Sequence, residues 1–433
     1  MSVEPSYKIE SFLDMDFSDF LWVLLYVILM FGSSIQTYTG FAYVDEIAAC
    51  VLIIAAGWKL VGGWFRKELV VPVPAVISLV SFAFLVLCGV MCNFLYGYQT
   101  RIPNIIIDIF TCLKFPIVLL CSMLVFARSG KTIVTYIEGF ARVLAIFLAC
   151  LALLNLIVDF GMGTDPRFGL RASFLFICGH PAYLALLCLG LFLVFVRNLD
   201  RNKFYVFLTV LVMASTLRSK ALAFCVVGPA IIYFMRSGRK LNLIHILLIV
   251  LVGAAIGWDQ MTAYYQTDGS ARAEITRASL RIARDFFPVG TGFASFGSVF
   301  SAQGSFYSPV YYEYGLNEVW GLSPDDTFFL SDTFWPTVLG QFGVLGLLLY
   351  LVGTGSVLVL ASSHGQQSRM VVACCLAYYL IESTSASALF NPTAVYIGMS
   401  LGIVVSSLKE DAGRSSSFSS AVPAASVQDG VRI

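Results

Sequence analysis

The sequence predicts an all-α polytopic membrane protein with about twelve transmembrane helices and one large outer loop. Two observations indicate this class. Hydrophobic residues make up 58% of the chain and charged residues only 12%, with a mean hydropathy of +0.84, whereas a soluble domain carries roughly a quarter charged residues. Uncharged apolar runs long enough to cross a bilayer also recur along the 433 residues.

The apolar runs divide the chain into four parts. We expect helices with short loops over residues 1–258, the large loop over 259–334, further helices over 335–408, and a disordered Ser- and Ala-rich tail over 409–433. The expected spans lie near residues 20–38, 42–61, 70–91, 103–126, 140–158, 174–196, 204–217, 220–235, 241–258, 335–361, 370–389 and 393–408.

Basic residues in alternate short loops predict the orientation, since loops rich in Lys and Arg stay in the cytoplasm. The segments "WFRKE", "ARSGKT", "RNLDRNK" and "RSGRK" would face the cytoplasm together with both termini. The N-terminal segment is polar and acidic, so we expect the first span to act as its own insertion signal. The large loop then lies outside, and long ordered loops commonly carry function.

Charge and cysteine usage exclude other classes. The net charge of +1 and the lack of a basic tract predict no nucleic-acid partner. The 11 cysteines lie mainly inside apolar runs without a C-x-x-C pair, which is typical of small buried hydrophobic residues rather than disulfides or metal ligands.

Basic residues also gather on the predicted outer side, against the positive-inside tendency. Arg218 is the clearest case because "STLRSKALAF" leaves it between two apolar runs with almost no loop. It could mark a helix end with its charge in water, or pair with an acid; a guanidinium group there also suits a phosphate. The outer basic residues are Arg167, Arg171, Arg218, Lys220, Arg272, Arg277, Arg281 and Arg284.

Four motifs occur in a specific order: "GHPAYLA" following an outer-loop arginine, "STLRSKALAF", "RIARDFFPVGTGFASFG" inside the large loop, and "SDTFWPTVLGQFGVLG" before an apolar helix. This order resembles the superfamily of O-antigen polymerases and O-antigen ligases, bacterial polytopic membrane proteins that polymerise or transfer lipid-linked glycans. In that family a Ser-Arg-x-Ala-like turn, an Asn-Pro-φ-x-Gly-x-Gly motif and a Glu-x-Gly-φ-φ-Gly helix motif follow one another. The corresponding stretches here are 215–221, 287–292 and 341–346.

The sequence departs from the family pattern at three positions. Phe287 replaces the asparagine before proline, Gln341 replaces the glutamate, and Asp332 stands where the family has a histidine. Related peptidoglycan glycosyltransferases use an outer-loop acid, which makes an aspartate credible. The missing histidine and the Arg281–Gly292 spacing, which fits an Arg-x10-Gly pattern, favour a polymerase over a ligase.

The resemblance implies a GT-C-like glycosyltransferase in the bacterial cytoplasmic (inner) membrane. It would polymerise undecaprenyl-pyrophosphate-linked oligosaccharide repeats by inverting transfer at the outer face, with a lipid-linked glycan as donor and another as acceptor. A chain-length regulator protein is a candidate partner, and no cofactor is expected. A ligase that transfers the glycan to lipid A core is the alternative.

The chemistry of the transfer assigns the candidate roles. A carboxylate can take the proton of the attacking hydroxyl, and Asp332 is the first candidate, followed by Asp325 and Asp326. Helix capping is the structural alternative for Asp332, which precedes Pro336 at the start of an apolar run. Guanidinium groups would hold the pyrophosphate, and the candidates are Arg218 and Arg281, helped by Arg171 and Arg277.

Further residues are candidates for binding the glycan and for supporting the residues of the site. Gly290 and Gly292 would let the backbone approach the sugar or lipid head, and Tyr312 and Trp320 suit either sugar stacking or the membrane interface. His180 is expected to make a helix-end hydrogen bond, with a place in the site as the alternative. Glu382 is expected to support the site by contacting an arginine. No metal is predicted, although Asp325, Asp326 and Asp332 could hold one if they converge.

A secondary transporter or a flippase of lipid-linked sugar is the rival class. Such carriers usually have related halves and central sites on broken helices. This sequence has neither a half-to-half similarity nor a central position for its long loop.

Overall fold

The computed structural model describes residues 16–67, 70–158, 160–164, 166–167, 169, 172–237, 262 and 269–420. Arg171 and the span expected over 241–258 lie outside the described residues. The first half of the described chain contains α1 Phe17–Met30, α2 Gly32–Thr39, α3 Val44–Phe65, α4 Val73–Tyr96, α5 Ile102–Val125, α6 Gly130–Ile157, the antiparallel pair β1 Gly163–Thr164 and β2 Ser173–Phe174, α7 Pro181–Val196, α8 Leu199–Ser215 and α9 Ser219–Arg236.

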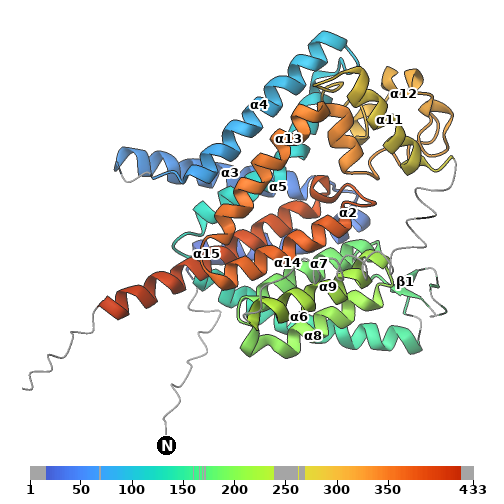
Figure 1. Ribbon diagram of the computed structural model, residues 1–433. Helices are drawn as coiled ribbons and strands as arrows, with labels where there is room; N and C mark the ends of the chain where they lie inside the picture. The colour runs from blue at the N-terminus through green and yellow to red at the C-terminus, as the bar shows by residue number, and fades with distance from the viewer. Residues whose placement is uncertain are drawn as a thin grey trace, which may run out of the picture.

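The second half begins with short helices and ends with three long ones. Its elements are α11 Ala271–Asp285, η2 Val299–Ala302, α12 Pro309–Glu313, η3 Leu316–Glu318, α13 Trp335–Ser362, α14 Gln366–Glu382, η4 Ala388–Phe390 and α15 Thr393–Ser420. Figure 1 shows α15 running through the bundle between α3–α5 on one side and α6–α9 on the other.

The structure confirms a mostly helical membrane protein. Six described helices are long and apolar enough to cross a membrane, and the pair α1–α2, bent by 60°, makes a seventh if it counts as one span. Twelve spans remain a prediction. The sequence predicts disorder from residue 409, but α15 continues to Ser420.

The large loop folds into a helical cap, which we define as residues 269–334. Its helix α11 has alanine and isoleucine at spacings of four, three and four residues, and such a stripe covers one face of a helix. Figure 1 places this cap at one end of the bundle, beside the end of α4 and the start of α13. The apolar core of the cap is separate from that of the bundle and consists of Ala271, Ile275, Ala278, Ile282, Phe296, Val310, Tyr311, Leu316, Leu322 and Leu330.

The cap is joined to α13 where that helix is interrupted. Gly343 has φ 63° and ψ −165°, a conformation that only glycine adopts at low cost. The interruption frees backbone groups of α13, and the segment 288–292 pairs with them. Thr291 N–H donates to the Gly340 carbonyl (3.1 Å), Gly292 N–H to the Gln341 carbonyl (2.8 Å), and Leu345 N–H to the Pro288 carbonyl (3.0 Å).

Buried polar side chains of α4 and α5 hold the same part of the cap. Asn93 exchanges two hydrogen bonds with the backbone of Phe293 (2.8 and 2.9 Å). The Asp108 carboxylate accepts from Ala294 N–H (2.6 Å) and from the Ser298 hydroxyl (2.5 Å). An acid inside an apolar helix therefore satisfies donors of the cap instead of pairing with a charge on its own helix.

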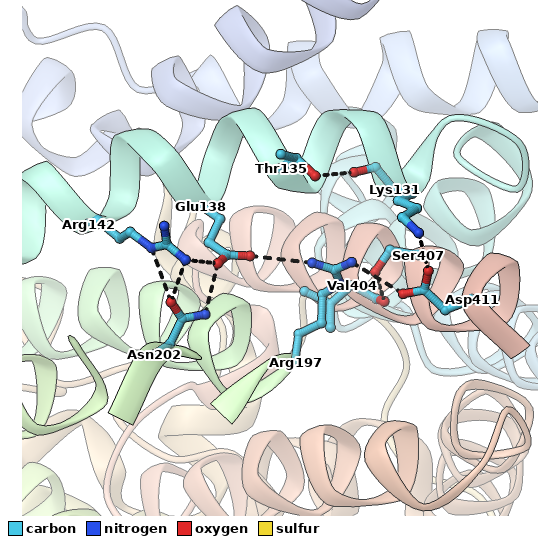
Figure 2. A network of polar contacts seen from close by, with 9 residues as sticks. All are labelled: Lys131, Thr135, Glu138, Arg142, Arg197, Asn202, Val404, Ser407 and Asp411. Atoms are coloured by element: carbon cyan, nitrogen blue, oxygen red, sulfur yellow. Dashed lines mark hydrogen bonds and ion pairs between the residues drawn. The ribbon is translucent and has the colours of Figure 1, made fainter. Parts of the chain in front are cut away.

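A polar network joins four helices at the end of the bundle away from the cap. Glu138 of α6 accepts hydrogen bonds from Arg142, from Asn202 of α8 (2.9 Å) and from Arg197 after α7 (3.3 Å). Arg197 also contacts Asp411 of α15 (3.4 Å) (Figure 2). Together with the contact of Lys131, at the start of α6, with Asp411 (2.6 Å), these contacts bring the start of α6, the connection between α7 and α8, and α15 near Asp411 together at one end of the bundle. Which side of the membrane this end faces remains a prediction.

Candidate functional site

The candidate site lies at the cap end of the bundle, around Asp332. The Oδ2 atom of Asp332 accepts from Nη2 of Arg272, on α11, at 2.5 Å. The side chains of Asp332 and Arg272 are 30% and 16% exposed, so the pair is half-buried. The N-cap position of α13 is Phe334, and no side chain of the described residues caps that helix. Helix capping is therefore not what holds Asp332.

A second ion pair lies beside the first. Nζ of Lys220, in the first turn of α9, is 3.1 Å from Oε1 of Glu382, the last residue of α14. Lys220 is also close enough to Asp332 to lower the pKa of that carboxyl. Glu382 thus pairs with a lysine and not with the arginine that the sequence analysis expected.

Arg218 and His180 lie near Lys220, at the starts of α9 and α7. Arg218 is the N-cap residue of α9, after a turn in which Leu217 adopts a positive φ of 50°. Nδ1 of His180 accepts from Ala182 N–H at 3.2 Å and caps α7, which confirms the expected helix-end hydrogen bond.

The pKa shifts in this region reflect burial and crowded positive charge. Burial, together with the nearby charges of Arg218, Lys220 and Arg167, lowers the pKa of His180 to about 4. Burial raises the pKa of Asp332, while Arg272 and Lys220 act against this rise. The site thus combines a neutral histidine, several cations and a carboxylate of increased basicity.

The structure shows where two of the predicted arginines of α11 lie. Arg281 donates to the Tyr314 carbonyl (3.2 Å) and lies over that residue's ring, and Arg277 pairs with Glu274 (2.5 Å). Arg281 is nine residues from Arg272, which is about two and a half turns of helix, so the two face opposite sides of α11. Arg272, which was not among the predicted pyrophosphate ligands, is therefore the arginine of α11 that pairs with Asp332.

An aromatic chain connects the ion pair to the exposed face of the cap. Arg272 lies 5.6 Å from the centre of the Phe329 ring, and Trp320 packs edge-on against the same ring at 5.1 Å. Trp320 is 70% exposed, so its ring is available near the site. Tyr312 is also exposed but packs on Tyr307, elsewhere in the cap core.

The other acids do not join Asp332. Asp325 and Asp326 lie in a turn closed by an isolated bridge between Ser323 and Asp326. Among the described residues no three His, Cys, Asp or Glu side chains come close enough to hold a metal ion. The three aspartates therefore do not converge.

The glycine motif has a structural role that differs from the expected one. Gly290 and Gly292 are buried. A Cβ atom on Gly290 would lie 2.4 Å from the Gln341 carbonyl carbon, and one on Gly292 would lie 2.8 Å from Asn93. The close backbone approach that requires glycine is thus to α13 and α4, and the helix motif 341–346 provides the matching interruption.

Two comparisons with known proteins were made. No family model matches the sequence, and no curated protein matches it significantly.

Proposed function

We propose that this chain is a GT-C-like membrane glycosyltransferase that polymerises polyprenyl-pyrophosphate-linked oligosaccharide repeats. The transfer would be inverting and would take place at the outer face of the bacterial cytoplasmic membrane. One observation supports this proposal most: the half-buried Asp332 is paired with Arg272 beside Lys220, at the cap end of apolar helices. The order of sequence motifs supports the class of substrate.

The cations of the site would bind the pyrophosphate. Arg272 and Lys220 are each held by a carboxylate in this structure. A guanidinium group and an ammonium group carry five and three N–H donors, respectively, and N–H donors of both kinds bind phosphate oxygens. Arg218 and Lys220 both lie close enough to His180 to lower its pKa, so Arg218 adds a further positive charge beside Lys220. Charge that develops on the leaving pyrophosphate is stabilised more strongly by fixed cations in a partly dry site than in water.

The carboxylate would act on the acceptor. In the proposed step the acceptor hydroxyl oxygen forms a bond to the anomeric carbon, while the bond from that carbon to the pyrophosphate oxygen breaks. The hydroxyl proton passes to Asp332, and polyprenyl pyrophosphate leaves with the electron pair. A carboxylate with a raised pKa is a better base for this step than a fully solvated one. Trp320 is positioned to stack on an acceptor sugar.

The proposal is tested with purified protein in detergent and no ion gradient. Lipid-linked repeat units should be lengthened into a ladder of products, separated by gel electrophoresis. Transfer only onto lipid A core oligosaccharide would show that the protein is a ligase and not a polymerase. Movement of substrate across the membrane of sealed vesicles, without new glycosidic bonds, would show that the protein is a transporter or flippase and not a glycosyltransferase.

A further inference from the structure

An apolar cavity opens between α13 and α14 directly beneath the candidate site. Its volume is about 190 Å³, and its lining includes Trp335, Tyr350, Gly355, Leu376 and Tyr379. We call it the α13–α14 groove. Its upper rim is adjacent in the chain to both carboxylates of the site, because Trp335 follows Asp332 by three residues and donates to the hydroxyl of Ser383 (2.9 Å), the residue after Glu382.

The groove is closed at the back and open at the side. Aromatic rings of Phe334, Tyr350 and Phe390 pack on one another behind it, with centroid distances of 4.9 to 6.0 Å. At its mouth Leu351, Leu376 and Leu380 are 40% to 50% exposed. Since α13 has the length and composition of a membrane span, this mouth faces hydrocarbon rather than water.

We propose that the α13–α14 groove binds the first isoprenoid units of the polyprenyl chain of the substrate. This inference depends on the proposed function for the identity of the lipid. The cavity is of the same order as the roughly 150 Å³ apolar cavity that takes up one benzene ring. It therefore accommodates only the part of the chain nearest the phosphate, while the remainder lies among membrane lipids.

Two features favour an isoprenoid over a saturated acyl chain. The lining is rich in aromatic rings, which suit the flat, unsaturated units of a polyprenol. The hydroxyl of Tyr379 is buried and has no hydrogen-bond partner among the described residues, and a carbon–carbon double bond can accept a weak hydrogen bond from it. The polar head of a chain held here would emerge at the rim, beside Lys220 and Arg272.

The test uses a polyprenyl monophosphate with a diazirine in its first isoprene unit, bound to the full protein in phospholipid nanodiscs. After irradiation, labelled peptides are identified by mass spectrometry. We expect labels on α13 and α14, and at least about tenfold less labelling in Gly355→Phe. Gly355 tolerates a Cβ because no atom lies within 4 Å of that position, and Leu376→Trp fills the groove from the other helix.

Gly139→Phe is the matched control, because Gly139 is a helical glycine with equally open space but lies outside the groove, on α6. Labels spread evenly over the lipid-facing helices would overturn the inference. The inference would also be overturned if both groove variants were labelled as strongly as the wild type. The same holds if a diacyl phospholipid displaced the probe as well as an unlabelled polyprenyl phosphate does. Groove labelling without glycan elongation would leave the binding site standing and refute only the proposed function.

Discussion

Replacing Asp332 by asparagine separates a catalytic role from a structural one. The change keeps the size of the side chain but removes the charge that pairs with Arg272 and the base that would accept a proton. Exposed ion pairs contribute roughly 0.2–1 kcal/mol, whereas breaking a buried pair costs about 3–5 kcal/mol. With the two side chains 30% and 16% exposed and the pKa of the Asp332 carboxyl raised by burial, the ionised pair adds little to stability. We therefore expect Asp332→Asn to change the free energy of unfolding by at most about 1 kcal/mol.

The expected loss of activity is much larger. General base catalysis contributes about 10²- to 10⁴-fold to a rate, which corresponds to about 3–5 kcal/mol in the barrier. The elongation rate of lipid-linked repeats should therefore fall at least 100-fold in Asp332→Asn, with protein level and melting temperature near those of the wild type. Asp332→Glu should restore part of the rate because it returns a carboxylate.

The assay measures single-turnover elongation in detergent, with Arg272→Gln as the matched variant from the other side of the ion pair. If Asp332 served only to hold Arg272, both variants would lose the same rate, and the double variant would lose no more. Elongation at near wild-type rate by both Asp332→Asn and Asp332→Ala would refute the base assignment. The raised pKa of Asp332 also predicts how the wild-type rate depends on pH. As the pH decreases, the rate should begin to fall at a pH above the ordinary range of aspartate pKa values, because protonation removes the base.

Three further predictions concern stability and are checked by thermal unfolding in detergent. Asp108→Ala leaves two buried donors of the cap without an acceptor and should cost about 2–5 kcal/mol, and an unchanged melting temperature would contradict the anchoring role. Gly290→Ala brings a Cβ atom against the backbone of α13 and should cost at least about 2 kcal/mol, while Gly139→Ala, in open space, should not destabilise. The pKa of His180 is lowered from 6.5 to about 4, so the unfolded chain binds more protons between these values. Stability should therefore decrease as pH falls from 6.5 to about 4, and His180→Asn, which retains a capping oxygen, should lack this part of the decrease.

The sequence was sufficient to predict the helical membrane class and to single out Asp332, which the structure places in a half-buried ion pair with Arg272. Composition and long apolar runs fix the class because a bilayer requires helices of a given length. Asp332 could be found because an acid just before an apolar helix is unusual. The burial that raises its pKa could not be inferred, since this burial comes from packing against α11 and α9, which are distant in the chain.

The partner of Asp332 was missed for a geometric reason. The sequence analysis treats residues 259–334 as a loop and prefers Arg281 within it because of its spacing to Gly292. Yet "ARAEITRASLRIARD" has its apolar residues on one helical face, and this periodicity alone separates Arg272 from Arg281. The role of the glycine motif could not be inferred in the same way, because it depends on a break in α13 that only the tertiary structure reveals.

The hydrogen bonds that join α4 and α5 to the cap have a consequence for biogenesis. Asp108 is separated by 186 residues in the chain from Ala294, whose N–H donates to it, and Asn93 by 200 residues from Phe293. At roughly 5–20 residues per second, the ribosome takes about 10–40 s to make the donors after the acceptors have left it. The hairpin formed by α4 and α5 must therefore wait in the bilayer with unmet polar groups, and a chain truncated before residue 293 would be a natural target for membrane quality control.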